Sequence, residues 1–196
     1  MEELKLLLFP EQKIAEMKKQ EGWENAVSFP FARDIGVIPV LITEEEWQEV
    51  LLPCKDDASF GWYLRQVNPQ YMLIPFDEMP WFGGSPGEIP EGMFILSRRS
   101  RGDGGLSRFG ASIFCHREVC EEIADEFGEG FYIIPSSVHE LFILPESFVI
   151  GTENLDKLLG YLNYLNDVIK RFHPNDFLSE HLYYYNDKTG EVTDVA

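Results

Sequence analysis

Cysteine, basic residues and long hydrophobic runs are all scarce in this sequence of 196 residues. It has three cysteines, and their spacing is not that of a disulfide-stapled module. An odd, low cysteine count is typical of a reduced, intracellular protein. No apolar run approaches the roughly eighteen residues of a membrane-spanning helix, and the start lacks the basic and long apolar segments of a signal peptide. We therefore expect a cytoplasmic protein that does not associate with membranes.

Positive charge is the clearest deficit. The chain has 16 Lys and Arg residues against 34 Asp and Glu residues, which gives a net charge of −18. Such a surface repels phosphate groups, so direct nucleic-acid binding is not expected. The charge is also uneven, because residues 118–196 hold 16 acidic and 4 basic residues, a net charge of −12. The C-terminal part is therefore expected to carry most of the negative field.

The apolar content excludes a disordered acidic tail. Hydrophobic residues make up 44% and aromatic residues 14% of the chain. A chain of this length buries roughly 70% of its extended surface on folding, so it needs no disulfides or metals for stability. We expect a single domain over residues 1–196, in which residues 1–92 form a divergent N-terminal half and residues 93–196 a C-terminal half.

Hydrophobic periodicity and helix breakers predict the secondary structure. Helices are predicted over residues 10–20, 44–52, 116–127 and 152–172, and residues 58–68 fit either a short helix or a loop. Strands are predicted over residues 36–42, 71–76, 93–96, 107–115, 131–134, 138–144, 182–185 and 191–195. This order predicts an α+β fold, an antiparallel sheet with helices packed mainly on one face.

Two local signals refine that prediction. Thr43 and Glu46 have the spacing of a capping box, which would start the helix that carries Trp47. Pro39 lies within a predicted strand and cannot donate a ladder hydrogen bond, so it predicts an edge strand or a bulge.

Four segments of the C-terminal half carry a family resemblance. They are Met93 to Leu96, Phe109 to Ile113, Tyr132 to Leu141, which contains Pro-Ser-Ser-Val-His-Glu, and Phe177 to Tyr185, which contains three consecutive tyrosines. Over roughly residues 93–192 the chain resembles an uncharacterised domain family of Firmicutes that is often encoded near mobile elements. The resemblance implies a shared fold and a bacterial or phage setting, and it implies no activity.

The most suggestive catalytic set is Ser136, Ser137, His139 and Glu140. A hydrolase needs a hydroxyl, a base within hydrogen-bond reach and an orienting acid, and all three types occur here. On an extended strand, however, His139 and Glu140 point to opposite faces. A turn in which the serine hydroxyls satisfy backbone groups is the alternative interpretation.

Cys115, His116 and Cys120 are the candidate metal ligands. His116 and Cys120 would share a helix face, but zinc needs four ligands and the chain has no second cysteine pair. His139, His173 and His181 would contribute only if the fold brought them close. We expect no metal and no cofactor.

Charge and aromatic residues supply the other candidates, all for partner binding. Glu118, Glu122, Asp125 and Glu129 recur at helical spacings of three and four and predict one acidic face. Arg98, Arg99 and Arg101, with Arg108, form a basic island that would either hold an anion or balance the acidic body. Trp81 and Phe82 lie in a loop rich in proline and glycine and would either anchor a partner or cover the core.

Three functions therefore stay open. The first is an acidic interaction module that binds a basic host protein, in its sharpest form an inhibitor that mimics nucleic acid and blocks a basic groove. The second is a hydrolase that uses Ser136 or Ser137 with His139. The third is an accessory domain with no catalytic role, and the oligomeric state is not readable.

Overall fold

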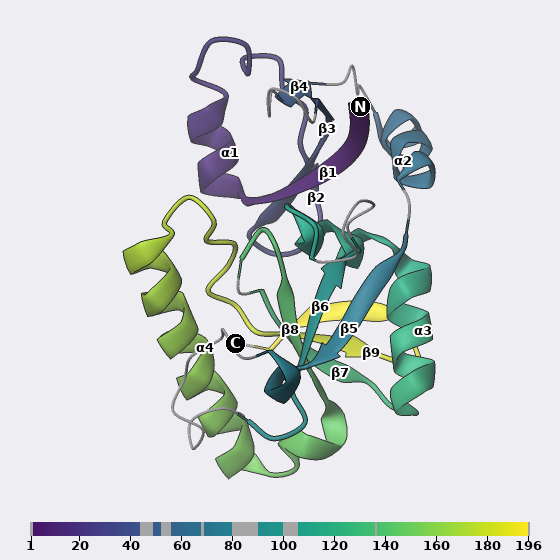
Figure 1. The fold of residues 1–196 in the computed structure, drawn as a ribbon, viewed down its shortest axis with the longest axis vertical. Helices are drawn as coiled ribbons and strands as arrows, with labels where there is room; N and C mark the ends of the chain where they lie inside the picture. The colour runs from purple at the N-terminus through teal and green to yellow at the C-terminus, as the bar shows by residue number, and fades with distance from the viewer. Residues whose placement is uncertain are drawn as a thin grey trace.

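The structure is a computed structural model that describes residues 2–43, 49–51, 56–67, 69–79, 90–99, 106–135 and 137–195. Two antiparallel sheets lie towards opposite ends of the long axis, and helices flank both of them (Figure 1). No helix within these ranges combines the length and hydropathy needed to cross a bilayer.

The first sheet is built by the N-terminal part of the chain. Its strand order is β1-β3-β2, and β4 also pairs with β3. The bounds of its elements are β1 (Glu2–Pro10), α1 (Glu11–Met17), β2 (Phe29–Pro30), β3 (Ile35–Thr43) and β4 (Glu49–Leu51). Helix α1 starts after Pro10, which has no N–H to donate, and buries Ile14 and Met17.

The second sheet has six strands in the order β10-β9-β7-β8-β6-β5. Its strands are β5 (Tyr71–Pro75), β6 (Phe94–Arg98), β7 (Phe131–Ile134), β8 (Leu141–Pro145), β9 (Tyr183–Asn186) and β10 (Glu191–Asp194). The other helices are α2 (Asp57–Gln66), η1 (Phe76–Glu78), η2 (Gly110–Cys115), α3 (Arg117–Phe127), η3 (Glu146–Val149) and α4 (Thr152–Phe172).

Helices α3 and α4 lie on opposite sides of the six-stranded sheet (Figure 1). Every residue of the central strand β8 is buried, so both faces of the sheet need an apolar cover. One core contains Val119 and Ile123 of α3 and continues into the N-terminal sheet through Leu6, Leu7 and Leu8. The other core contains Leu158 and Leu162 of α4. The predicted α+β class is confirmed, but the helices are not gathered on one face.

One predicted strand is wrong. Residues 107–115 contain the 3-10 helix η2, preceded by Phe109 in the left-handed conformation with φ 61°. That dihedral angle turns the chain out of the extended path. Gly110 then packs so closely against the sheet that an added Cβ would lie 2.6 Å from the His139 carbonyl oxygen.

The helix predicted over residues 44–52 is wrong at its end, since β4 is a strand. Val50 and Leu51 pair with Leu41 and Val40 of β3, so tertiary strand pairing outweighs the local capping signal. Glu46 and Trp47 lie outside the described residues. Pro39 lies in β3, a central strand, in register with Leu6 of β1. Strand β2 pairs with β3 before Pro39, and β4 pairs with β3 after Pro39.

Candidate functional site

The segment that contains Ser136, Ser137, His139 and Glu140 connects β7 to β8. Ser136 lies outside the described residues. The Ser137 hydroxyl donates to Glu140 Oε1 at 2.7 Å and accepts from the His139 backbone N–H at 3.0 Å. Ser137 is only 4% exposed. These are the contacts of a turn, and they leave the Ser137 hydroxyl bonded to a carboxylate and to the backbone.

The His139 imidazole uses both ring nitrogens. Its Nδ1 accepts from the Phe109 backbone N–H at 3.0 Å, and its Nε2 lies 3.4 Å from Asp176 Oδ1. Because Nδ1 is an acceptor, the ring proton of the neutral form is on Nε2 and points to Asp176. The ring therefore has no lone pair left for a serine hydroxyl or for a metal ion.

His139 also holds the turn that precedes η2. Its backbone carbonyl accepts from the Ser97 hydroxyl at 2.9 Å, and its ring lies 5.5 Å from the Phe109 ring. The left-handed Phe109 and the close approach of Gly110 to β6 both depend on this packing. His139 thus joins β6 through its backbone carbonyl, and the η2 turn and the chain after α4 through its imidazole.

Asp176 brings together two of the predicted histidines. Its Oδ2 lies 3.8 Å from His173 Nδ1, on the other side of the carboxylate from His139. Burial raises the pKa of the nearby Glu140 carboxyl, and the negative charge of Asp176 raises it further, although the hydrogen bond from Ser137 opposes the shift. Within the described ranges, no set of three or more His, Cys, Asp or Glu side chains has the arrangement of a metal site.

The second metal candidate consists of the half-buried Cys115, the buried Cys120 and the buried imidazole of His116. Burial raises the pKa of Cys115 and raises that of Cys120 to about 12, so both thiols stay protonated at neutral pH. His116 is 2% exposed, and burial lowers its pKa. Its Nδ1 lies 3.4 Å from Glu118 Oε1. Cys120 belongs to the apolar core, and Cys115 packs against it.

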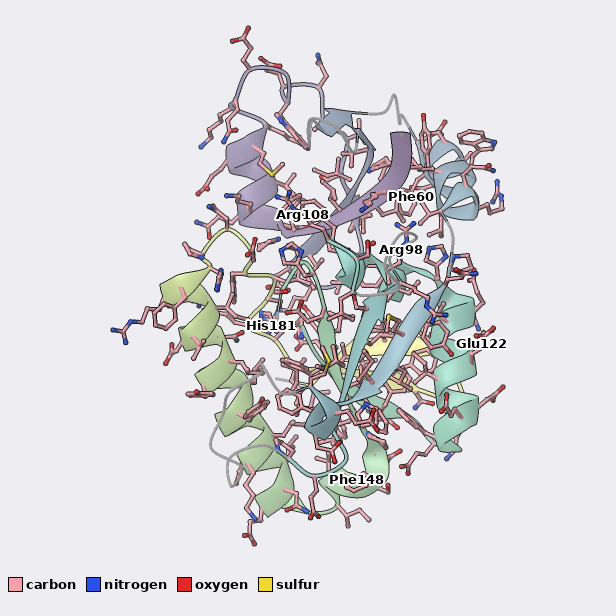
Figure 2. All side chains as sticks on the ribbon, in the orientation of Figure 1. Phe60, Arg98, Arg108, Glu122, Phe148 and His181 are labelled. Atoms are coloured by element: carbon pink, nitrogen blue, oxygen red, sulfur yellow. The ribbon has the colours of Figure 1, made fainter. Side chains whose placement is uncertain are left out.

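The basic island is divided by burial. Arg98 is 3% exposed and belongs to the interior of β6, whereas Arg99 and Arg108 are exposed. Arg108 lies near the boundary between the two sheets (Figure 2), with its guanidinium carbon 5.0 Å from the Phe109 ring centroid. Arg101, Trp81 and Phe82 lie outside the described residues. Among the described arginines of the island, Arg99 and Arg108 therefore reach the surface.

Helix α3 displays the predicted acidic face. Its buried residues are apolar, namely Val119, Cys120, Ile123 and Ala124. Its exposed residues are Arg117 and five acids, Glu118, Glu121, Glu122, Asp125 and Glu126. Figure 2 shows Glu122 on α3 at the margin of the molecule. Arg117 forms an ion pair with Glu121 at 2.7 Å.

Glu129, the last residue predicted for that face, has a structural role. It lies just after Gly128, the left-handed residue that ends α3, and its Oε1 accepts from the Ser147 N–H at 3.1 Å. The carboxylates that this face exposes are therefore those within the helix, of which Glu121 is paired with Arg117.

A polar junction between the two sheets is absent from the sequence-based predictions. Asp34 accepts from the Ser179 hydroxyl at 2.8 Å and from the Tyr183 hydroxyl at 2.5 Å. Burial and the Asp34 hydrogen bond raise the pKa of Tyr183, so the phenol stays a donor. Ser179 and Tyr183 belong to the fourth family-like segment, which was the available signal. Asp34 is 145 residues from Ser179 and has no local pattern.

Comparison with known proteins supplies a family and no function. Searches of curated proteins and of solved structures found no match. Residues 64–187 match a family described as "Family of unknown function (DUF5688)". The match begins before residue 93, so part of the N-terminal half predicted to be divergent also lies within it. The matched range is more than half of the sequence, and the chain belongs to this uncharacterised family.

Proposed function

We propose that this protein is a non-enzymatic interaction module that binds a basic surface of a partner protein through α3. The observation that carries the proposal is the sidedness of this helix. Its apolar residues are buried against the sheet, and five carboxylates cover its exposed side with one arginine. Like charges at helical spacing cost about 0.2–0.5 kcal/mol per pair. A basic partner would offset this repulsion with attraction between its positive charges and the carboxylates.

The charge of the whole chain supports the same proposal. A net charge of −18 raises the rate at which a basic protein is captured, because the field acts before contact. The strongest form of the proposal is an inhibitor that mimics nucleic acid, with carboxylates in place of phosphates in a basic groove. A cytoplasmic, bacterial setting near mobile elements belongs to that form.

The hydrolase alternative gains no support from the described residues Ser137 and His139, and Ser136 lies outside the described part of the chain. It requires a serine oxygen about 3 Å from an imidazole nitrogen. The Ser137 hydroxyl instead donates to Glu140, and the His139 nitrogens are engaged by Phe109 and Asp176.

The test is capture of partners from host lysate with two matched variants. The first variant neutralises α3 (Glu118→Gln, Glu122→Gln, Asp125→Asn), and the control removes the same charge from exposed positions of α4 (Glu153→Gln, Asp156→Asn, Asp167→Asn). We expect the α3 variant to lose basic partners that the wild type and the control retain.

Competition tests the mimic form of the proposal. Added duplex DNA should release a partner whose nucleic-acid groove is occupied. Equal capture by the wild type and the α3 variant would overturn the proposal, and capture that DNA does not affect would overturn the mimic form alone.

A further inference from the structure

Strand β9 places its tyrosines on opposite faces of the six-stranded sheet. Tyr183 and Tyr185 are buried in the core that contains α3, whereas Tyr184 is half-buried on the other face. There it is in register with the half-buried Tyr132 of β7, which packs against the core on the α4 side. The two ring centroids are 5.1 Å apart, and the ring planes are inclined by 53°. The pair therefore offers two inclined aromatic rings that both keep part of their surface open to solvent.

A carboxylate is held beside this tyrosine pair. The Tyr184 hydroxyl donates to Glu146 Oε2 at 2.7 Å, and the Glu146 backbone N–H donates to the Gly130 carbonyl at 3.0 Å. Gly130 makes room for this arrangement, because a Cβ at its position would overlap the Tyr184 hydroxyl. Within the described part of the chain, no Lys or Arg side chain forms an ion pair with Glu146. Its second oxygen, Oε1, is therefore available to a ligand.

The charges that act on the two phenols most strongly are negative. Burial raises the pKa of Tyr184, and Glu146 and Asp187 raise it further. Burial also raises the pKa of Tyr132, and Glu146 again acts in the same direction. An aromatic face next to unneutralised carboxylates attracts a cation and repels an anion.

The cations that pair near β10 lie on the other face of the sheet. Arg117 belongs to α3. Arg33 and His181 both face Asp194. Asp194 is in register with Tyr183, which is buried in the core that contains α3. The sheet thus separates these cations from the tyrosine pair and its carboxylate.

We propose that Tyr132, Tyr184 and Glu146 bind an arginine side chain of the basic partner. The guanidinium plane stacks on a tyrosine ring while its N–H groups donate to Glu146 Oε1. Arginine is favoured over lysine, because a planar fork can stack and donate at once whereas an ammonium is a point charge. This inference rests on the proposed function for the source of the arginine and adds a contact outside α3. A second copy is a poor source, since each chain carries a net charge of −18.

The test uses the full chain and a defined probe, Nα-acetyl-arginine amide. The control is Nα-acetyl-citrulline amide, which has nearly the same shape and no charge. Proton NMR follows the ring resonances of Tyr132 and Tyr184, assigned by their loss in Tyr132→Leu and Tyr184→Leu. The arginine compound should shift both sets of resonances with a Kd on the order of millimolar, as a single exposed cation contact allows. The citrulline compound should shift neither.

Two pairs of variants separate the site from general attraction to an acidic protein. Glu146→Gln should weaken binding of the arginine compound about fivefold, which corresponds to about 1 kcal/mol. Glu153→Gln removes the same charge at an exposed position of α4 and should leave Kd unchanged. Tyr132→Leu should also weaken binding about fivefold, whereas Tyr164→Leu removes an exposed tyrosine of α4 and should have no effect. Circular dichroism verifies that each variant is folded.

The outcomes distinguish this inference from the proposed function. Equal shifts with the arginine and citrulline compounds, arginine-dependent shifts that spare both rings, or equal Kd values for Glu146→Gln and Glu153→Gln would each overturn the arginine site alone. Absence of arginine binding would also overturn it. The proposed function would then stand or fall with α3-dependent capture from lysate, in which Glu146 is unchanged.

Discussion

His139 shows how a residue with catalytic chemistry becomes a structural one. The Phe109 N–H donates to Nδ1 of His139. A proton on Nδ1 would therefore point at the Phe109 N–H and bring two hydrogen-bond donors together. Burial lowers the pKa of His139, and Arg108 and His173 lower it further, although the negative charge of Asp176 acts in the opposite direction. Burial also lowers the pKa of His116.

These shifts predict a loss of stability in mild acid. The unfolded chain takes up a proton near pH 6.5 that the folded histidines resist, so the free energy of unfolding should fall as the pH drops below about 6.5. The slope is limited to about 1.4 kcal/mol per pH unit for each histidine. Glu140 acts oppositely, because its pKa is raised by burial, so the free energy of unfolding rises as the pH falls from that raised pKa to the unfolded value of 4.5.

His139→Asn isolates this contribution. The asparagine carbonyl can accept from the Phe109 N–H without titrating, so chemical denaturation between pH 7 and pH 5.5 should show a shallower loss than in the wild type. His173→Asn, at an exposed position, is the control. Identical pH profiles for His139→Asn and the wild type would contradict the assignment.

Asp34 predicts a second effect at the residue scale. Asp34→Ala leaves the Ser179 and Tyr183 hydroxyls without their shared acceptor, and Ser179 is fully buried. Hydrogen bonds to a charged group contribute about 1.5–3 kcal/mol, so the variant should lose on the order of 2–3 kcal/mol in urea denaturation. Asp77→Ala, an exposed acid in η1, should stay within about 0.5 kcal/mol of the wild type. Equal effects of the two variants would show that Asp34 does not join the sheets.

At the scale of the element, repulsion among the α3 carboxylates is expected to lower the stability of the fold, and the same carboxylates are expected to bind the partner. The triple variant of Glu118, Glu122 and Asp125 relieves like-charge repulsion and should unfold at the same temperature as the wild type or a few degrees higher. Calorimetry measures this directly. A loss of more than about 1 kcal/mol would mean that these carboxylates support the fold, and the argument from sidedness would fail.

The two long helices of the C-terminal half were well predicted from the sequence. A period of 3.6 residues and a clear terminator mark α4 over residues 152–172 and α3 up to Gly128. Strand β1 was missed because its described interior, Lys5 to Phe9, is buried on both faces and so shows no alternation. The left-handed Phe109 that ends the extended path before η2 depends on His139, 30 residues away.

In the candidate site, too, features with a local sequence signal could be predicted and features made by contacts across the fold could not. The acidic face of α3 follows from local spacing and could be read from the sequence. The contacts that occupy His139, and the junction that ends at Asp34, are made across the fold and have no local signature. Exposure of Arg99 and burial of Arg98 could not be assigned before the pairing of β6 with β5 and β8 was known.

At the scale of the whole molecule, the two sheets share one apolar core while the surface carries a large negative excess. That core includes residues of β1, β3, α3 and the six-stranded sheet. The proposed recognition takes place on this exterior, and electrostatic recognition weakens with salt.

The most direct test is the dissociation constant of the captured partner, measured at about 50 mM and about 500 mM NaCl for the wild type and the α3 triple variant. The account predicts that wild-type affinity falls at least tenfold over this range. It also predicts that the triple variant binds weakly at both concentrations, while the α4 control follows the wild type. Affinity that is unchanged by salt and equal in the wild type and the triple variant would contradict the claim that α3 carboxylates recognise the partner.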